Sequence, residues 1–279
     1  MSGYNDWMTF DYKNKYFCMN PIDLKFRNKQ SSIEHTIEQM VGKYENLYVS
    51  LSGGLDSEFV AKCLYEHGVK FTPIIVDYKS NANEIWYAHR WCYEHKIKPI
   101  IIKLTRDDII TNFAKISEKY NTAFICAIDF IVETYVSKLH GRLITSAAEP
   151  FDRTNSFHDN LTMKTSYMLD FRTYDLMLDY YMPHKHSYNF LIYTPDLLYN
   201  IVKNLDYEKP VQLAMSEYYG VLPRPKINSL SNIVFHGDSV VKLMSDSNSK
   251  RDLSSICVGN KDEFLKKFEN GEIIYGIFK

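Results

Sequence analysis

The chain has only five cysteines among its 279 residues, and no two of them form a CxxC pair. They are Cys18, Cys63, Cys92, Cys126 and Cys257. Scattered cysteines in odd number argue against a disulfide framework and against a structural zinc site. We therefore expect reduced, mostly buried thiols and a cytoplasmic protein.

A surplus of basic residues is also missing. The 33 Lys and Arg residues are balanced by 34 Asp and Glu residues, which gives a formal net charge of −1. Proteins that bind long nucleic acids usually carry a basic surplus, so we do not expect such a partner. We see no apolar signal segment at the start and no run of about 18 or more apolar residues, so we expect no membrane span.

Apolar residues predict alternating strands and helices between residues 46 and 146. Strands are predicted at 46–52, 69–78 and 98–105, and a fourth ends near Ser146. A helical stretch at 107–139 is expected to consist of two helices that meet near Asn121. Strands rich in Ile, Val and Leu without strict alternation indicate a parallel sheet covered on both faces. We predict a doubly wound α/β fold, in which ligands bind at the carboxyl ends of the strands.

The remaining segments give a coarser domain division. We expect an N-terminal extension at 1–40, an α/β domain at 41–193, and a mostly helical region at 194–279 that completes the site and ends in a tail. Thr194-Pro195 is a typical helix start, and a final helix, Asn-Gly turn and strand are expected near the end. The pattern between 151 and 190 is weak.

One loop joins the first strand of the α/β domain to its first helix. Its residues are Leu51, Ser52, Gly53, Gly54, Leu55, Asp56 and Ser57. Backbone N–H groups in a glycine-rich turn at a helix N-terminus converge on an anion, and the serine hydroxyls add donors. Asp56 would repel a phosphate unless a cation lies between them, so we expect Mg²⁺ to link the two.

The loop has no lysine after its glycines. Neither GxxxxGK[ST] nor GxGxxG is present, and a plain strand–turn–helix is the alternative interpretation. The stretch LSGGLDS resembles the SGGxDS signature of the PP-loop ATP pyrophosphatases, above all the synthetase domain of asparagine synthetase-like enzymes. The resemblance implies an adenine nucleotide alpha hydrolase-like fold. It also implies that the loop holds the pyrophosphate part of ATP.

The resemblance further implies where the adenosine and the metal lie. Leu51, Val76 and Ser146-Ala147 match the positions that flank the adenosine in the family. The segment TSAAEP departs from the family's glycine-rich segment, and its Glu149 matches an acidic residue near the metal and substrate. Asp77 follows the second strand, where roles in binding substrate or ribose and in capping or a turn are both open.

Two lysines are candidates for the missing positive charge. The stretch EKPVQLAMSEYYGVLPRPK resembles a lysine-plus-helix segment of the family that ends in RPK. Lys209 matches a lysine that contacts pyrophosphate in the family, and Lys226 is a second candidate. Either would stabilise charge that develops on the α and β phosphates. A solvated lysine at a helix start is the alternative for Lys209.

By this resemblance we expect an ATP-dependent ligase that uses ATP and Mg²⁺. It would adenylate a carboxyl or amide-like oxygen of a small-molecule acceptor, release pyrophosphate, and then release AMP when a nitrogen nucleophile attacks. The loop begins at residue 52, which leaves no room before it for an amidotransferase domain. The nitrogen would therefore come from solvent, from the substrate or from a partner such as a separate amidotransferase. A nucleobase or tRNA modification enzyme of the same fold and a non-catalytic adenine-nucleotide-binding module are the alternatives.

Overall fold

A computed structural model describes most of the α/β domain and parts of the remaining chain. The described residues are 2–4, 7–11, 16–21, 24–25, 28–41, 46–120, 126–146, 170–172, 187–206, 209, 211–224, 255–257 and 261–277.

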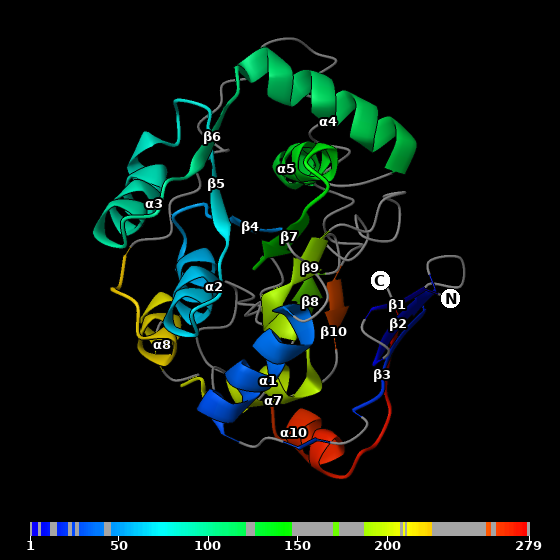
Figure 1. The fold of residues 1–279 in the computed structure, drawn as a ribbon. Coiled ribbons are helices and arrows are strands. Elements are labelled where there is room, and N and C mark those ends of the chain that lie inside the picture. Colours follow the sequence, from blue (N-terminus) through cyan, green and yellow to red (C-terminus); the bar gives the residue numbers. More distant parts are fainter. Residues whose placement is uncertain are drawn as a thin grey trace.

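A five-stranded parallel sheet organises the fold, in the order β6-β5-β4-β7-β9 (Figure 1). Its strands are β4 (Leu47–Ser50), β5 (Thr72–Asp77), β6 (Ile100–Lys103), β7 (Arg142–Thr145) and β9 (Ser187–Asn189). Each neighbouring pair is parallel, so the carboxyl ends all lie at one edge. The chain adds β5 and β6 on one side of β4, and β7 and β9 on the other. The end of β4 is therefore the point where ligands bind in open α/β sheets.

Helices cover both faces of this sheet, as the sequence predicts. They are α2 (Leu55–Glu66), α3 (Ala82–Glu94), α4 (Arg106–Tyr120) and α5 (Cys126–Lys138). Ile75 and Ile144 belong to an apolar cluster that includes residues of α2 and α3. Their neighbours Ile74 and Leu143 belong to a second cluster with Val132 of α5. Successive side chains of a strand point to opposite faces, so the doubly wound arrangement is confirmed.

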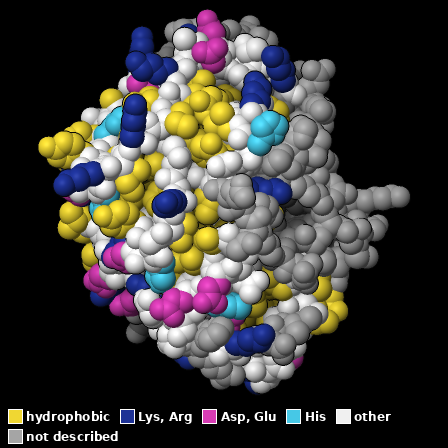
Figure 2. Space-filling view, in the orientation of Figure 1, with side chains coloured by type: hydrophobic (Ala, Val, Ile, Leu, Met, Phe, Trp, Pro, Cys, Tyr) yellow, Lys and Arg dark blue, Asp and Glu magenta, His cyan; other side chains and the backbone are white. Residues whose placement is uncertain are grey.

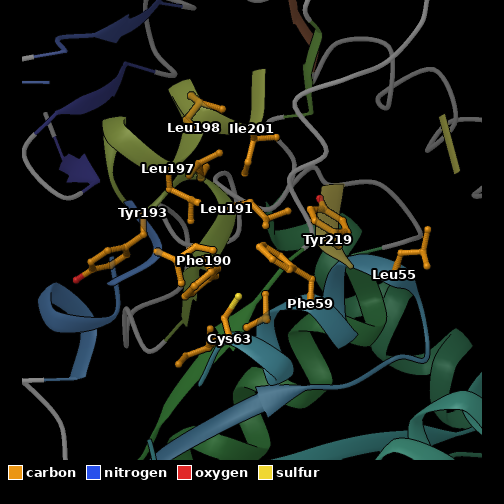
Figure 3. Close-up of a cluster of buried hydrophobic side chains, with 14 of the residues drawn as sticks. Leu55, Phe59, Cys63, Phe190, Leu191, Tyr193, Leu197, Leu198, Ile201 and Tyr219 are labelled. Atoms are coloured by element: carbon orange, nitrogen blue, oxygen red, sulfur yellow. The ribbon is translucent and has the colours of Figure 1, made fainter. Parts of the chain in front are cut away.

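The larger cluster extends well beyond the sheet. It includes residues of α1 (Lys29–Val41), the 3₁₀ helix η1 (Phe190–Ile192), α7 (Pro195–Asn204), α8 (Val211–Tyr219) and α10 (Lys261–Glu269). Thr194 caps α7, since its side chain accepts the Leu197 N–H, and Pro195 is at the helix start as predicted. Figure 3 shows Phe59 and Cys63 of α2 packed with Phe190, Leu197 and Tyr219.

Both ends of the chain contribute to one antiparallel sheet with the order β1-β2-β3-β11. Its strands are β1 (Ser2–Tyr4), β2 (Met8–Asp11), β3 (Tyr16–Met19) and β11 (Ile274–Ile277). Trp7 Nε1 donates to the Tyr193 carbonyl at 3.2 Å. Met19 and Ile274 belong to the larger core cluster. The segments that we expected to be an extension and a tail are thus paired with each other and packed on the core.

A separate antiparallel pair joins β8 (Asp170–Arg172) to β10 (Ser255–Cys257). Cys63 and Cys92 are buried free thiols, as expected, and Cys18 is half-buried. Within the described ranges, no helix is both long and apolar enough to cross a membrane. Lys and Arg side chains are scattered over the face seen in Figure 2 rather than gathered into one patch.

Candidate functional site

The glycine-rich loop, residues 51–54, follows β4 and leads directly into α2. The Leu51 N–H donates to the Ile74 carbonyl at 2.8 Å, which continues the pairing of β4 with β5 into the loop. Gly53 has a φ of +91°, and a Cβ added there would lie 2.0 Å from the backbone oxygen of Glu84 in α3. The loop therefore approaches α3 so closely that only glycine fits at this position.

Two serine hydroxyls fix the shape of the loop. Ser57 Oγ donates to the Gly54 carbonyl at 3.1 Å, and Ser52 Oγ accepts the Gly54 N–H at 3.2 Å. The two hydroxyl oxygens lie 3.1 Å apart, within hydrogen-bond distance, and either can be the donor. Gly54 is the N-cap of α2 and has no side chain to cap the first-turn N–H groups. This helix end can therefore offer its N–H groups and its dipole to an anion.

Asp56 lies half-buried in the first turn of α2. The hydroxyl of Tyr219, at the end of α8, donates to Asp56 Oδ1 at 2.8 Å. The Tyr219 ring stacks on Phe59, with centroids 4.3 Å apart and planes inclined by 14°. Asp56 and Phe59 are three residues apart on one helix, so one residue of α8 contacts both.

Arg224, which follows α8, reaches the same loop. Its Nη1 donates to Glu58 Oε2 at 2.7 Å, and its Nη2 donates to the Gly54 carbonyl at 3.1 Å. The side chains of Arg224 and Glu58 are only 3% and 10% exposed. The guanidinium carbon lies 4.6 Å from the centroid of the Tyr87 ring in α3. Arg224 therefore links α2, α3 and the loop through one buried side chain.

The end of β5 is held by a turn. Asp77 Oδ1 accepts the Lys79 N–H at 2.9 Å, where Lys79 has a φ of +64°. Asn81 Nδ2 donates to the Val76 carbonyl at 2.8 Å, and Asn81 Oδ1 accepts the Tyr78 N–H at 3.1 Å. Asp77 thus has the turn role. Its binding of substrate or ribose, and the place of Val76 beside the adenosine, remain predictions.

Lys209 lies between two carboxylates before α8. Its Nζ is 2.5 Å from Glu217 Oε2 and 3.6 Å from Asp206 Oδ2. The hydrogen bond to Glu217 is the main cause that raises the pKa of Lys209. Its contact with pyrophosphate remains a prediction.

The other predicted residues lie in two groups. Leu51 is 1% exposed and belongs to the core, and Ser146 is half-buried just after β7. Ala147, Glu149 and Lys226 lie outside the described residues. The roles of all five in binding ATP or metal remain predictions.

A known protein family matches the segment that contains this loop. Residues 30–142, which include nearly all of α1, the loop and the strands β4, β5 and β6, match the family model of asparagine synthase. Over this segment the chain is similar to the PP-loop synthetase domain of that family. A search of curated proteins found no match.

Solved structures also resemble part of this chain. An NMN synthetase from Francisella tularensis is 15% identical, with 42% of this chain and 51% of that chain covered and a TM-score of 0.33. An NH3-dependent NAD synthetase from Campylobacter jejuni is 21% identical, with 42% and 56% covered and a TM-score of 0.31. A predicted subunit of a tRNA methyltransferase from Methanocaldococcus jannaschii is 22% identical, with 39% and 55% covered and a TM-score of 0.30.

The chain spans about half the length of these three structures.

The donor set of the loop fits ATP and magnesium. The uncapped N-terminus of α2 and the exposed Ser52 suit phosphate oxygens. Among the described residues, no group of three or more His, Cys, Asp or Glu side chains could enclose a metal. Mg²⁺ commonly uses one or two carboxylates together with phosphate oxygens and water, so Asp56 suits it without an enclosing cluster.

Sequence reasoning missed Tyr219, Arg224 and Glu58 as parts of the site. Arg224 and Glu58 are 166 positions apart, and Tyr219 and Asp56 are 163 apart. The only available signal was the RPK of residues 224–226, which points to a basic segment and not to its partner.

Proposed function

We propose that the protein is an ATP-dependent ligase that cleaves ATP between the α and β phosphates. The observation that carries this proposal is the loop itself. It presents an uncapped helix end, two linked serine hydroxyls and Asp56, and it has no lysine among its residues. The match of residues 30–142 to the asparagine synthase family supports the same reaction.

In the first step an oxygen of the acceptor, a carboxylate or an amide-like oxygen, attacks the α-phosphorus. The bond from this phosphorus to the bridging oxygen breaks, and pyrophosphate leaves with the electron pair. The N–H groups at the start of α2 and the Ser52 hydroxyl bind the departing pyrophosphate, while Ser57 holds the loop through its bond to the Gly54 carbonyl. Magnesium, when bound at Asp56, would neutralise phosphate charge.

In the second step a nitrogen nucleophile attacks the activated carbon. The bond from this carbon to the adenylate oxygen breaks, AMP leaves, and the nitrogen loses a proton. No residue of the chain needs to form a covalent bond, so binding and orientation supply the catalysis. Lys209 and Lys226 would stabilise the phosphate charge, and Asp77 and Glu149 are proposed to lie near ribose and metal respectively.

A calorimetric titration tests the binding half of this proposal. We expect the protein to bind magnesium pyrophosphate and Mg-ATP competitively, and to bind phosphate far more weakly, because the proposed reaction requires the loop to hold both phosphates of pyrophosphate. Asp56→Asn is expected to weaken magnesium pyrophosphate binding by about 10- to 100-fold. The control is Glu66→Gln, which removes the same charge at the far end of α2. A wild-type protein that binds pyrophosphate no better than phosphate would contradict the proposal.

A further inference from the structure

Tyr219 is held in place from three directions. It is 1% exposed, and its ring stacks on Phe59 while its hydroxyl donates to Asp56. Lys62, from the same helix α2, donates through Nζ to the carbonyls of Gly220 at 2.8 Å and Tyr219 at 3.4 Å. Contacts with α2 therefore fix both the ring and the backbone of Tyr219, and with them the position of its hydroxyl.

A second lysine fixes the same helix end. Lys29 Nζ donates to the Tyr218 carbonyl and lies 4.5 Å from the centroid of the Tyr218 ring. Burial lowers the pKa of Lys29. Cations at the last carbonyls of a helix are stabilising, because these carbonyls are unpaired within the helix and carry its negative dipole end. The end of α8 is thus attached to α1 and α2.

The neighbouring residue provides a contrast. Tyr218 is also buried, but its hydroxyl has no hydrogen-bond partner within the described part of the chain. The two tyrosines share a helix end and an aromatic cluster, and both approach Phe59. Of these two tyrosines, Tyr219 is the one whose hydroxyl donates to the Asp56 carboxylate in α2.

We propose that Tyr219 is a positioning residue, whose hydroxyl fixes the orientation of Asp56 for a magnesium ion on the phosphates of ATP. This inference rests on the proposed function. A hydrogen bond to a charged carboxylate is about twice as strong as one between neutral groups, and it selects one orientation of the side chain. Partners of this kind orient the groups that bind a metal, and their loss typically weakens metal binding.

The test is a magnesium titration of the full chain in the presence of α,β-methylene-ATP, which cannot be cleaved between those phosphates. Tyr219→Phe keeps the ring and removes only the hydroxyl. We expect it to raise the magnesium concentration for half-maximal analogue binding by about tenfold. Saturating magnesium should restore most of the binding. Tyr218→Phe is the matched control. It should leave the magnesium midpoint unchanged, because the Tyr218 hydroxyl makes no hydrogen bond to Asp56 or to any other residue in the described part of the chain.

A double variant separates this role from a general loss of stability. If Tyr219 acts through Asp56, then Tyr219→Phe will produce no further shift of the magnesium midpoint in an Asp56→Asn background. An unchanged midpoint in Tyr219→Phe overturns the inference, and so does an equal shift in the Asp56→Asn background. If the wild type binds neither the analogue nor pyrophosphate, the proposed function fails and this inference with it. If the wild type binds the analogue and Tyr219→Phe has the same magnesium midpoint, the inference about Tyr219 is rejected and the proposed function is not.

Discussion

Gly53 combines an unusual backbone angle with a close neighbour, and this makes it the least replaceable residue of the loop. Its φ is +91°, and a Cβ would overlap the Glu84 carbonyl at 2.0 Å. We predict that Gly53→Ala lowers the free energy of unfolding by about 4 kcal/mol or more, because a backbone atom must move. Urea unfolding measures this change.

Gly68, which follows the other end of α2, is the matched control for that variant. Its φ is +69°, and an added Cβ would meet nothing within 4 Å. Gly68→Ala should therefore cost only the left-handed backbone strain, about 1–2 kcal/mol. Equal losses in the two variants would show that the contact with α3 does not constrain the loop.

The buried pair of Arg224 and Glu58 predicts that stability and ligand binding can be separated. Arg224→Met leaves Glu58 without its cation and should lower the free energy of unfolding by about 3–5 kcal/mol. The double variant Arg224→Met, Glu58→Leu removes both charges and should recover most of that loss. It still lacks the bond to the Gly54 carbonyl, so its affinity for α,β-methylene-ATP should remain below that of the wild type. Recovery of both stability and affinity would show that the bond from Arg224 to the Gly54 carbonyl does not contribute to ligand binding.

At this scale the sequence predicts the loop but not what surrounds it. The seven residues of LSGGLDS are contiguous, so their joint pattern can be recognised without a structure. Tyr219 and Arg224 reach the loop only because α8 packs against α2. Such a contact depends on packing between distant segments, and no local pattern encodes it.

Helix α5 carries a carboxyl pair that predicts a pH dependence of stability. Desolvation raises the pKa of Asp129 to about 7, and the nearby charge of Glu133 adds to the shift. The unfolded state titrates near pH 3.9, so the folded state binds more protons between about pH 4 and pH 7. The contribution of Asp129 to stability therefore falls as pH rises through this window. Asp129→Asn should remove this decline, as measured by urea unfolding at pH 5 and pH 8.

Asp108 in α4 is the control of opposite sign. Hydrogen bonds from the Thr105 hydroxyl and N–H lower its pKa. Its contribution is present above about pH 4 and is lost as the pH falls below that value. Asp108→Asn should thus leave the decline between pH 5 and pH 8 intact. A wild-type protein without that decline would contradict the assignment to Asp129.

Among the elements, the predicted helices and the first four parallel strands agree with the sequence, and the fifth parallel strand does not. The predicted pair of helices in 107–139 is found as α4, which ends at Tyr120, and α5, which begins at Cys126. The fifth parallel strand, Ser187–Asn189, was not predicted, because three residues are too few to show a period. Its place in the sheet is set by pairing with β7.

For the whole molecule, the pairing of the two chain ends could not be read from the sequence. Ile274 and Tyr275 are neighbours in β11 and face opposite sides, at 2% and 59% exposed. We predict that Ile274→Ala lowers the free energy of unfolding by about 2–4 kcal/mol, because it leaves a cavity in the shared core. Tyr275→Ala should change it far less. Similar small losses in urea unfolding would mean that β11 is not part of the cooperative core.

The central claim is that ATP is cleaved between its α and β phosphates. The most direct measurement is the identity of the products when the full chain is incubated with Mg-ATP and a metabolite extract as the source of acceptors and nitrogen donors. We predict AMP and pyrophosphate in equal amounts, with formation strongly reduced in Asp56→Asn. ADP and phosphate as the only products would contradict the account.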